Sequence, residues 1–324
     1  MRSDMMKIVY MGTPDFAVPP LRALAEAGYR VEAVVTQPDK PKGRGKALMP
    51  TPVKEEALKH GIPVFQPSKV REESFVRQLS ELDPDVIIVA AFGQIIPKEI
   101  LDMPAFGCLN IHASLLPKYR GAAPIQYAVI DGEKESGVTL MRMGTGLDTG
   151  DMIAKAVIPL AADETGGSLF DKLAQAGAKL LVETLPSVFD GTAVYEKQPE
   201  ESPTPYAAMI TKQMGLLDFS ESAEKLERLI RGLNPWPSAY TFLEGKTLKI
   251  WKAAVSGMEY DKNGQEALPG TVVLTDKEGI HVVCGEGRLI LQEVQLEGKK
   301  RMDAAAFLRG FPIAAGTRLA DHKE

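Results

Sequence analysis

The chain has few cysteines, no long apolar run and no excess of positive charge, and each shortage excludes a class of protein. Its 324 residues include only two cysteines, Cys108 and Cys284, which form no CxxC pair and no disulfide framework of the secreted type. No apolar stretch approaches the roughly 20 residues of a membrane span, and the residues from Met1 to Met6 do not read as a signal peptide. We therefore expect a cytoplasmic protein without a membrane segment.

The net charge of −5 argues against a generally basic nucleic-acid binder. The charge is uneven, however, because residues 209–324 carry equal numbers of acidic and basic side chains and the acidic excess lies before them. Inside that acidic part, the segment 37–51 is rich in Gly and Pro and carries a basic cluster. Such a cluster can bind a polyanion even on an acidic protein, although most charged runs are solvated surface loops. We expect a mobile loop here. The cluster comprises Lys40, Lys42, Arg44 and Lys46.

The length favours two domains. Strand-like and helix-like segments alternate in the first half, and the run 85–91 is almost continuously apolar, which is typical of a strand buried on both faces of a parallel sheet. This alternation of strands and helices predicts an α/β fold with a Rossmann-like open parallel sheet. We place this domain at residues 1–190 and a Pro-rich linker at 191–208.

Residues 209–324 show a different pattern. A helix at 223–232 is followed by short segments of β character at 239–243, 247–253, 270–275, 279–284 and 288–295. Short strands at this spacing predict a small β-barrel of the OB-like kind. The Asn234-Pro235-Trp236-Pro237 segment is interpreted as packing between the helix and the barrel.

Two polar side chains stand out near the middle of the first domain. In the strand-like segment 107–112, period-two alternation places Asn110 and His112 on one face and Leu109 and Ile111 on the other. A long loop rich in Pro, Gly and apolar residues follows at 113–124. A second loop, residues 144–151, contains three glycines and Asp148. Loops of this kind on a rigid sheet commonly line a pocket.

Each feature alone also has a structural interpretation. Asn110 and His112 could bond loop backbone, the Asp148 segment could be a hairpin turn, and Cys108 is interpreted as a small packing residue. Their combination favours an active site. No histidine has metal-ligand spacing to another His or a Cys, so we expect no metal.

Along nearly its whole length the chain resembles the methionyl-tRNA formyltransferase family, a group of folate-dependent formyltransferases. Six sequence motifs carry the resemblance, and the C-terminal segment 234–237 agrees with it. Folate formyltransferases broadly share the Asn-x-His, Ser-Leu-Leu-Pro and Asp elements, whereas the basic segment and the C-terminal domain indicate the tRNA enzymes. The motifs lie at 11–17, 36–46, 91–97, 110–117, 120–126 and 146–151.

The resemblance implies a reaction and a set of residues. The reaction is formyl transfer from 10-formyltetrahydrofolate to the methionine amino group of initiator methionyl-tRNA, and it needs no metal. A monomer is our default expectation. The implied catalytic residues are Asn110, His112 and Asp148. The implied tRNA contacts are Lys40, Lys42, Arg44 and Lys46, with Arg44 central. The implied folate-binding residues are Ser114, Leu115, Leu116, Pro117, Phe92, Gly93, Gln94, Ile95 and Ile96.

The chemistry agrees with these residue types. Attack of a neutral amine on a formyl carbon produces an oxyanion, which Asn110 and His112 could stabilise as donors. Asp148 would orient His112, and the two could shuttle the proton. Two alternatives stay open at this point. One is a formyltransferase for a small amine such as a ribonucleotide or an amino sugar, which would need neither the basic segment nor the barrel. The other is a non-catalytic nucleotide- or RNA-binding module.

Overall fold

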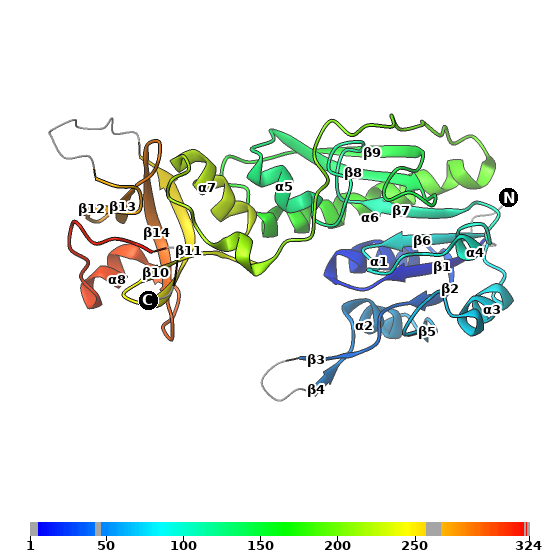
Figure 1. Ribbon diagram of the computed structural model, residues 1–324. Coiled ribbons are helices and arrows are strands. Elements are labelled where there is room, and N and C mark those ends of the chain that lie inside the picture. The colour runs from blue at the N-terminus through cyan, green and yellow to red at the C-terminus, as the bar shows by residue number, and fades with distance from the viewer. Residues whose placement is uncertain (1–5, 43–46, 257–266, 321, 323–324) are drawn as a thin grey trace. The chain divides into compact units, whose positions relative to one another are not determined.

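The computed structural model describes residues 6–42, 47–256, 267–320 and 322. The chain divides into two compact units (Figure 1). The first consists of Met1–Pro124, Glu135–Pro159 and Phe170–Ala207, and the second of Ile125–Lys134, Leu160–Leu169 and Ala208–Glu324. The domain limits at residues 190 and 208 stay a prediction.

A seven-stranded sheet forms the centre of the first unit, in the order β5-β2-β1-β6-β7-β8-β9. The neighbours from β5 to β7 are parallel, which confirms the predicted α/β class. β8 and β9 continue the sheet as antiparallel strands, and their pairing agrees with the hairpin interpretation of the segment between them. The strands are β1 (Lys7–Gly12), β2 (Arg30–Val35), β5 (Val64–Phe65), β6 (Val86–Ala90), β7 (Cys108–His112), β8 (Glu135–Arg142) and β9 (Met152–Pro159).

The apolar run at 85–91 becomes β6, and every residue of β6 is buried. Its position between β1 and β7 explains this composition, because helices cover both faces of a central parallel strand. One face packs against apolar side chains of α3 and α4, such as Phe75 and Ile100. On the other face Gly177 of α6 lies against Ile111 and Val138. The helices of this unit are α1 (Val18–Glu26), α2 (Pro52–Lys59), α3 (Glu73–Glu81), α4 (Lys98–Leu101) and most of α6 (Gly166–Asp190), with a 3-10 turn η2 (Asp15–Ala17) before α1.

The basic segment contains a two-stranded ribbon where the sequence predicted a loop. β3 (Lys40–Lys42) pairs antiparallel with β4 (Ala47–Met49), with Lys40 opposite Met49 and Pro41 opposite Leu48. The expectation of a loop throughout 37–51 was therefore wrong for these strands. Pro and Lys are poor strand formers, so local propensity does not reveal a pairing that backbone hydrogen bonds create.

An antiparallel sheet in the order β10-β11-β14-β13-β12 forms the second unit, with β15 paired to β14. The segment 318–320 bridges Phe242 of β10 and Thr271 beside β12, which connects the two edges of the sheet as the predicted barrel requires. The elements are α7 (Ala223–Gly232), β10 (Ala239–Leu243), β11 (Lys246–Val255), β12 (Val272–Thr275), β13 (Ile280–Val283), β14 (Arg288–Leu296), β15 (Met302–Asp303) and α8 (Ala304–Gly310), with α5 (Pro124–Ile130) and the 3-10 turn η3 (Lys212–Gly215).

The helix α7 covers the barrel with one apolar face. Ala223, Leu226 and Ile230 are buried in the barrel core, at the helical spacing that places them on one side. Asn234 follows the helix and donates from Nδ2 to the carbonyl oxygen of Trp251 at 3.1 Å, so the segment after α7 does contact the barrel. Trp236 is 55% exposed, so it contributes only part of its surface to this packing. Among the described residues, no helix combines the length and the apolar character that crossing a membrane requires.

Candidate active site

The strand β7 carries Asn110 and His112, and its alternation follows the predicted period of two. Leu109 and Ile111 are buried at 0% and 3% exposure, as members of the sheet core. On the other face Asn110 is half-buried and His112 is 6% exposed. Since residues two apart on a strand point the same way, the Asn110 amide and the His112 imidazole share one side of the sheet.

The hydrogen bonds of His112 define the chemistry of its two ring nitrogens. Nε2 lies 3.1 Å from the carbonyl oxygen of Tyr119. A carbonyl oxygen only accepts, so Nε2 carries the proton in the neutral ring and Nδ1 holds the lone pair. Nδ1 lies 3.6 Å from Oδ1 of Asp148. This distance exceeds a hydrogen bond, and the contact becomes an ion pair when the ring is protonated.

Asp148 reaches His112 from a loop that begins elsewhere on the sheet. The loop leaves β8 at Met143, whose N–H donates to Cys108 at the start of β7 at 2.7 Å. It then folds back, and Oδ2 of Asp148 accepts a 2.9 Å bond from the N–H of Gly121. The structure thus brings together the side chains of Asp148 and His112, with Asn110 on the same face as His112.

The loop after β7 contains the predicted Ser-Leu-Leu-Pro segment, and buried hydrogen bonds fix its shape. Ser114 donates from Oγ to the carbonyl oxygen of Lys118 at 2.7 Å. Leu116 is 1% exposed and packs against Met141 and Met152. The side chains of Ser114 and Leu116 are therefore structural, whereas Leu115 and Pro117 are half-buried and accessible.

The predicted folate-binding segment 92–96 follows β6, the neighbour of β7. The carbonyl oxygen of Phe92 accepts bonds from Thr13 Oγ1 at 3.0 Å and from Gln37 Nε2 at 3.1 Å. Gln94 accepts from the N–H of Val70 at 3.0 Å. Ile95, between these anchors and the buried Ile96, is 84% exposed. Because these bonds fix the backbone of the loop while Ile95 is exposed, the Ile95 side chain is able to contact a planar ligand.

The structure describes part of the predicted tRNA contact set. Lys40 is exposed, and its Nζ donates to Gln37 Oε1 at 2.9 Å. The backbone of Lys42 belongs to β3. Arg44 and Lys46 lie outside the described residues. Lys54, close to this set, is a structural residue, because its Nζ bonds Asp39 at 2.7 Å and Gln66 at 2.8 Å.

Sequence reasoning missed two buried polar residues of this region. Arg120 and Gln198 are 7% and 6% exposed and bond one another at 3.1 Å, and Gln198 also bonds the backbone of Asp148 at 2.9 Å. Gln198 falls in the Pro-rich segment that was interpreted as a linker. Its composition gave no signal of burial.

Cys108 has the packing role that its position suggested. Burial raises the pKa of its thiol to about 12, and Sγ lies 3.5 Å from the carbonyl oxygen of Ile100. A thiol with this pKa is almost entirely protonated at neutral pH, so Cys108 is a poor nucleophile.

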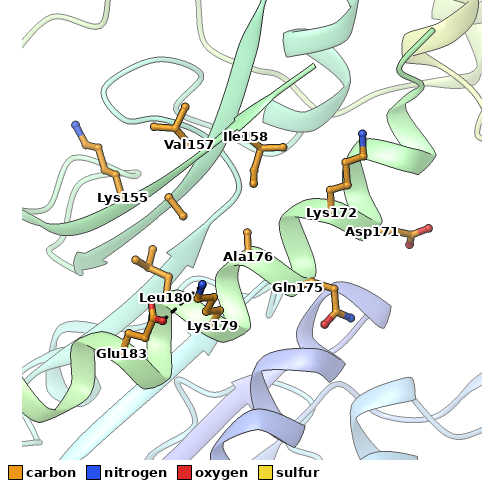
Figure 2. Close-up of a pocket in the computed structure, with 11 residues that line it drawn as sticks. Lys155, Val157, Ile158, Asp171, Lys172, Gln175, Ala176, Lys179, Leu180 and Glu183 are labelled. Atoms are coloured by element: carbon orange, nitrogen blue, oxygen red, sulfur yellow. Dashed lines mark ion pairs between the residues drawn. The ribbon is translucent and has the colours of Figure 1, made fainter. Parts of the chain in front are cut away.

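A groove of about 820 Å³ lies elsewhere in the first unit, between β9 and α6. Figure 2 shows the labelled side chains of both elements, among them Ile158 of β9 and Ala176 of α6. Lys179 and Glu183, one turn apart on α6, form an ion pair at 3.8 Å. It contains none of the predicted site residues. The groove holds no combination of groups suited to acyl transfer, so we assign it no catalytic role.

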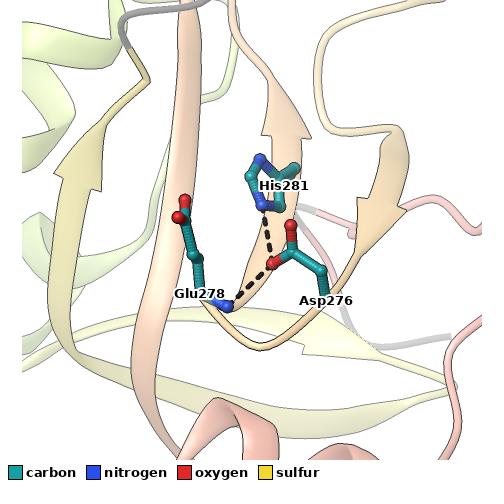
Figure 3. A group of neighbouring side chains, drawn as sticks. All are labelled: Asp276, Glu278 and His281. Atoms are coloured by element: carbon teal, nitrogen blue, oxygen red, sulfur yellow. Dashed lines mark hydrogen bonds and ion pairs between the residues drawn. The ribbon is translucent and has the colours of Figure 1, made fainter.

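Within the described ranges, one cluster of carboxylate and imidazole groups could in principle hold a metal: Asp276, Glu278 and His281. Figure 3 shows how the cluster forms at the turn between β12 and β13. Oδ1 of Asp276 accepts from the N–H of Glu278 at 2.8 Å and contacts Nε2 of His281 at 3.1 Å. These bonds are those of an Asp-stabilised turn, and they explain the cluster without an ion.

Comparison with known proteins identifies the family of the chain. The formyl transferase family model matches residues 6–185, and the model of the formyl transferase C-terminal domain matches residues 209–312. A methionyl-tRNA formyltransferase from Agathobacter rectalis is 57% identical over 96% of this chain and 99% of its own length. The Bacillus subtilis methionyl-tRNA formyltransferase is 53% identical over 99% of both chains. The chain belongs to the methionyl-tRNA formyltransferase family.

Solved structures that have lower sequence identity to this chain share its fold. The sugar 3N-formyltransferase WlaRD, determined with dTDP and 5-N-formyl-THF, matches with a TM-score of 0.65 and 20% identity over 91% of this chain and 99% of its own. HypX from Aquifex aeolicus, determined with tetrahydrofolic acid, matches with a TM-score of 0.62 and 17% identity over 96% of this chain. The match covers 48% of HypX, so this chain corresponds to about half of that protein.

Proposed function

We propose that the protein transfers the formyl group of 10-formyltetrahydrofolate to the amino group of methionine on initiator methionyl-tRNA. The observation that carries the proposal is identity of 57% and 53% to methionyl-tRNA formyltransferases over nearly the full length of both chains. The alignment with the Bacillus subtilis enzyme extends over 99% of both chains and therefore over both units, whereas the sugar 3N-formyltransferase WlaRD is only 20% identical over 91% of this chain. A cytoplasmic location and a monomeric state stay predictions.

In the proposed reaction the amine nitrogen bonds to the formyl carbon, and the bond from that carbon to the folate nitrogen breaks. One proton leaves the attacking nitrogen and one reaches the folate nitrogen. Between these steps the formyl oxygen carries negative charge. The half-buried Asn110 amide is the proposed donor to this oxygen, worth roughly 3–4 kcal/mol of transition-state stabilisation if it is placed in advance.

His112 is the proposed proton carrier, through Nδ1. Nε2 is committed to the Tyr119 carbonyl at 3.1 Å, so Nδ1 is the nitrogen that can accept a proton from the substrate amine. The carboxylate of Asp148, at 3.6 Å from Nδ1, then lies beside the positive charge of the imidazolium and stabilises it. As a donor, the charged ring can also assist Asn110 at the oxyanion.

The folate co-substrate fits between the loops that follow β6 and β7. Because these strands are parallel neighbours, their carboxyl ends lie at the same edge of the sheet. Ile95, at 84% exposure, offers an apolar contact on one side. Leu115 and Pro117 are half-buried and accessible on the other.

The tRNA would meet the basic ribbon through phosphate contacts. Lys40 is exposed there, and Lys42, Arg44 and Lys46 continue the cluster in sequence. A ribbon without aromatic side chains offers charge and not base stacking, which predicts contacts that position the tRNA and carry little sequence information.

The proposal is tested by incubating the protein with 10-formyltetrahydrofolate and charged initiator tRNA and measuring formyl-methionyl-tRNA. In parallel reactions, free methionine or an amino sugar replaces the tRNA as the acceptor. We expect a formylated product only in the reaction that contains the tRNA. Formylation of the amino sugar without formylation of the tRNA would replace the proposed acceptor, and the absence of any formyl product would favour a binding module.

A further inference from the structure

The segment 198–207, which the sequence presented as a linker, is built into the candidate active site. Ser202 donates from Oγ to the carbonyl oxygen of Pro117 at 2.9 Å, and Thr204 Oγ1 accepts from the N–H of Tyr119 at 2.7 Å. The N–H of Ala207 donates to the carbonyl oxygen of Arg120 at 2.8 Å. These bonds hold the loop after β7 along most of its length.

Gln198 uses its whole amide group on the Asp148 loop and on Arg120. Nε2 donates to the carbonyl oxygens of Asp148 at 2.9 Å and of Gly150 at 2.7 Å. Oε1 accepts from Nε of Arg120 at 3.1 Å. A buried amide with every group satisfied has one orientation only, and it transmits that orientation to the backbone that it holds.

Arg120 fixes Gln198 in turn. Its guanidinium donates to the carbonyl oxygens of Pro199 at 2.7 Å and Glu200 at 2.9 Å. An arginine that is 7% exposed is costly to bury unless its donors are satisfied. Here the planar guanidinium meets three acceptors on one short stretch of chain, so the position of Gln198 is set before a substrate arrives.

The Asp148 loop needs this external support. Asp148 has φ of 52°, a left-handed conformation that is unfavourable for a residue with a side chain. The neighbouring Gly146 and Gly150 offer no side chain to pack. The carboxylate is held by Gly121 at 2.9 Å and the carbonyl by Gln198 at 2.9 Å, so the residue is fixed at both ends.

We propose that Gln198, supported by Arg120, is a positioning residue that holds the Asp148 carboxylate beside Nδ1 of His112. This inference rests on the proposed catalytic role of the His112–Asp148 pair. Without Gln198 the glycine-rich loop would sample other conformations, and the carboxylate would face His112 only part of the time. The expected effect is on turnover, because the Gln198 amide donates to the backbone of Asp148 and Gly150 and, within the described part of the chain, no hydrogen bond joins it to the predicted folate-binding residues 92–96 and 114–117.

The first test compares Gln198→Ala and Gln198→Glu with wild type in formyl transfer to methionyl-tRNA. The glutamate variant keeps an acceptor for Arg120 but loses both donations to Asp148 and Gly150. Removing a residue that orients a catalytic group commonly reduces activity 10- to 100-fold. We expect both variants to lower kcat by about that factor. Their KM values for folate and tRNA should stay within roughly twofold of those of the wild type. The matched control is Thr241→Val, which removes the 2.9 Å donation of a buried threonine to the carbonyl oxygen of Ala320 in the barrel. It should retain wild-type kcat and KM.

The decisive measurement is a double-mutant cycle with Asp148→Ala. If Gln198 acts through Asp148, adding Gln198→Ala to Asp148→Ala lowers kcat no further. Two results would overturn the positioning role. One is a double variant whose loss of kcat equals the product of the two single losses. The other is a normal kcat in both Gln198 variants while Asp148→Ala is impaired. A normal kcat in Asp148→Ala would instead remove the proposed catalytic role, so the two failures differ. Circular dichroism identifies any variant that has lost its fold, and the glutamate variant, isosteric with wild type, then carries the comparison.

Discussion

An ion pair between α1 and α2, with a buried carboxylate and a partly exposed arginine, allows one prediction to be worked through in detail. Glu56 has a side chain that is 3% exposed, and it accepts from Arg22 at 2.6 Å and 3.0 Å and from Lys59 at 3.1 Å. The hydrogen bond from Arg22 is the largest of the interactions that lower the Glu56 pKa from 4.5 to about 2. The folded protein therefore prefers the ionised carboxylate.

The sign and size of the effect follow from proton linkage. A carboxyl with a depressed pKa in the folded state stabilises the fold above its unfolded pKa, and this contribution disappears as the pH falls from 4.5 to about 2. Each tenfold change in proton affinity corresponds to about 1.4 kcal/mol, so the upper limit of the contribution of Glu56 to the stability of the fold is roughly 3 kcal/mol. Arg22 is 44% exposed, and solvent screening of such a partner reduces the expected value to about 1–2 kcal/mol.

The prediction is that Glu56→Gln destabilises the first unit by about 1–2 kcal/mol at pH 7, with a difference from wild type that narrows below pH 4.5. Native-state hydrogen exchange of α1 and α2 measures it locally, which avoids assuming that both units unfold together. Glu73→Gln is the control, because Glu73 pairs with Arg77 at 2.8 Å but is 89% exposed. Equal small losses of stability in the Glu56 and Glu73 variants would refute the reasoning. A stability difference between Glu56→Gln and wild type that stays constant down to pH 3 would refute it as well.

Three further outcomes are expected. Asn110→Ala should lower kcat about 10²- to 10³-fold, as loss of one oxyanion donor does, and steady-state kinetics with unchanged circular dichroism checks this. Lys40→Ala should raise the KM for tRNA and make the slope of log affinity against log salt shallower by about one, whereas an unchanged slope would argue against a phosphate contact. Cys108 and Cys284, whose pKa values burial raises to about 12 and about 11, should not react with a thiol reagent at pH 8 before unfolding, and a rapid reaction would contradict their burial.

Much of the fold is visible in the sequence because its signals are local. The apolar run of β6 and the helical spacing of Leu226 and Ile230 in α7 each report burial directly. The helix α6 was not identified, since its interior contains Gly177 and Pro186, which both oppose a helix. The antiparallel pairing of β7 with β8 and the pairing of β3 with β4 arise from contacts between segments, and the sequence pattern did not predict them.

The candidate site shows the same limit. Period two alone places Asn110 and His112 on one face. The approach of Asp148 depends on a loop that begins beside Cys108 and folds back, and only the resemblance to a family predicted it. Gln198 lay beyond both kinds of reasoning, because a Pro- and Glu-rich stretch has the composition of a linker while its backbone and side chains are bonded to the site.

The two oxygens of Asp148 have separate tasks, and this division predicts that asparagine cannot replace it. Oδ2 accepts from the N–H of Gly121 at 2.9 Å, a bond that only an oxygen can receive, so the amide nitrogen of an Asp148→Asn variant must face Nδ1 of His112. An N–H₂ group there donates to the neutral ring and opposes the proton that Nδ1 would gain during the reaction. We therefore expect Asp148→Asn to keep the loop in place, with normal hydrogen-exchange protection, and to lose as much kcat as Asp148→Ala. Retention of most of the activity by the asparagine variant would show that Asp148 serves only to orient the ring, and that its charge does not assist proton transfer.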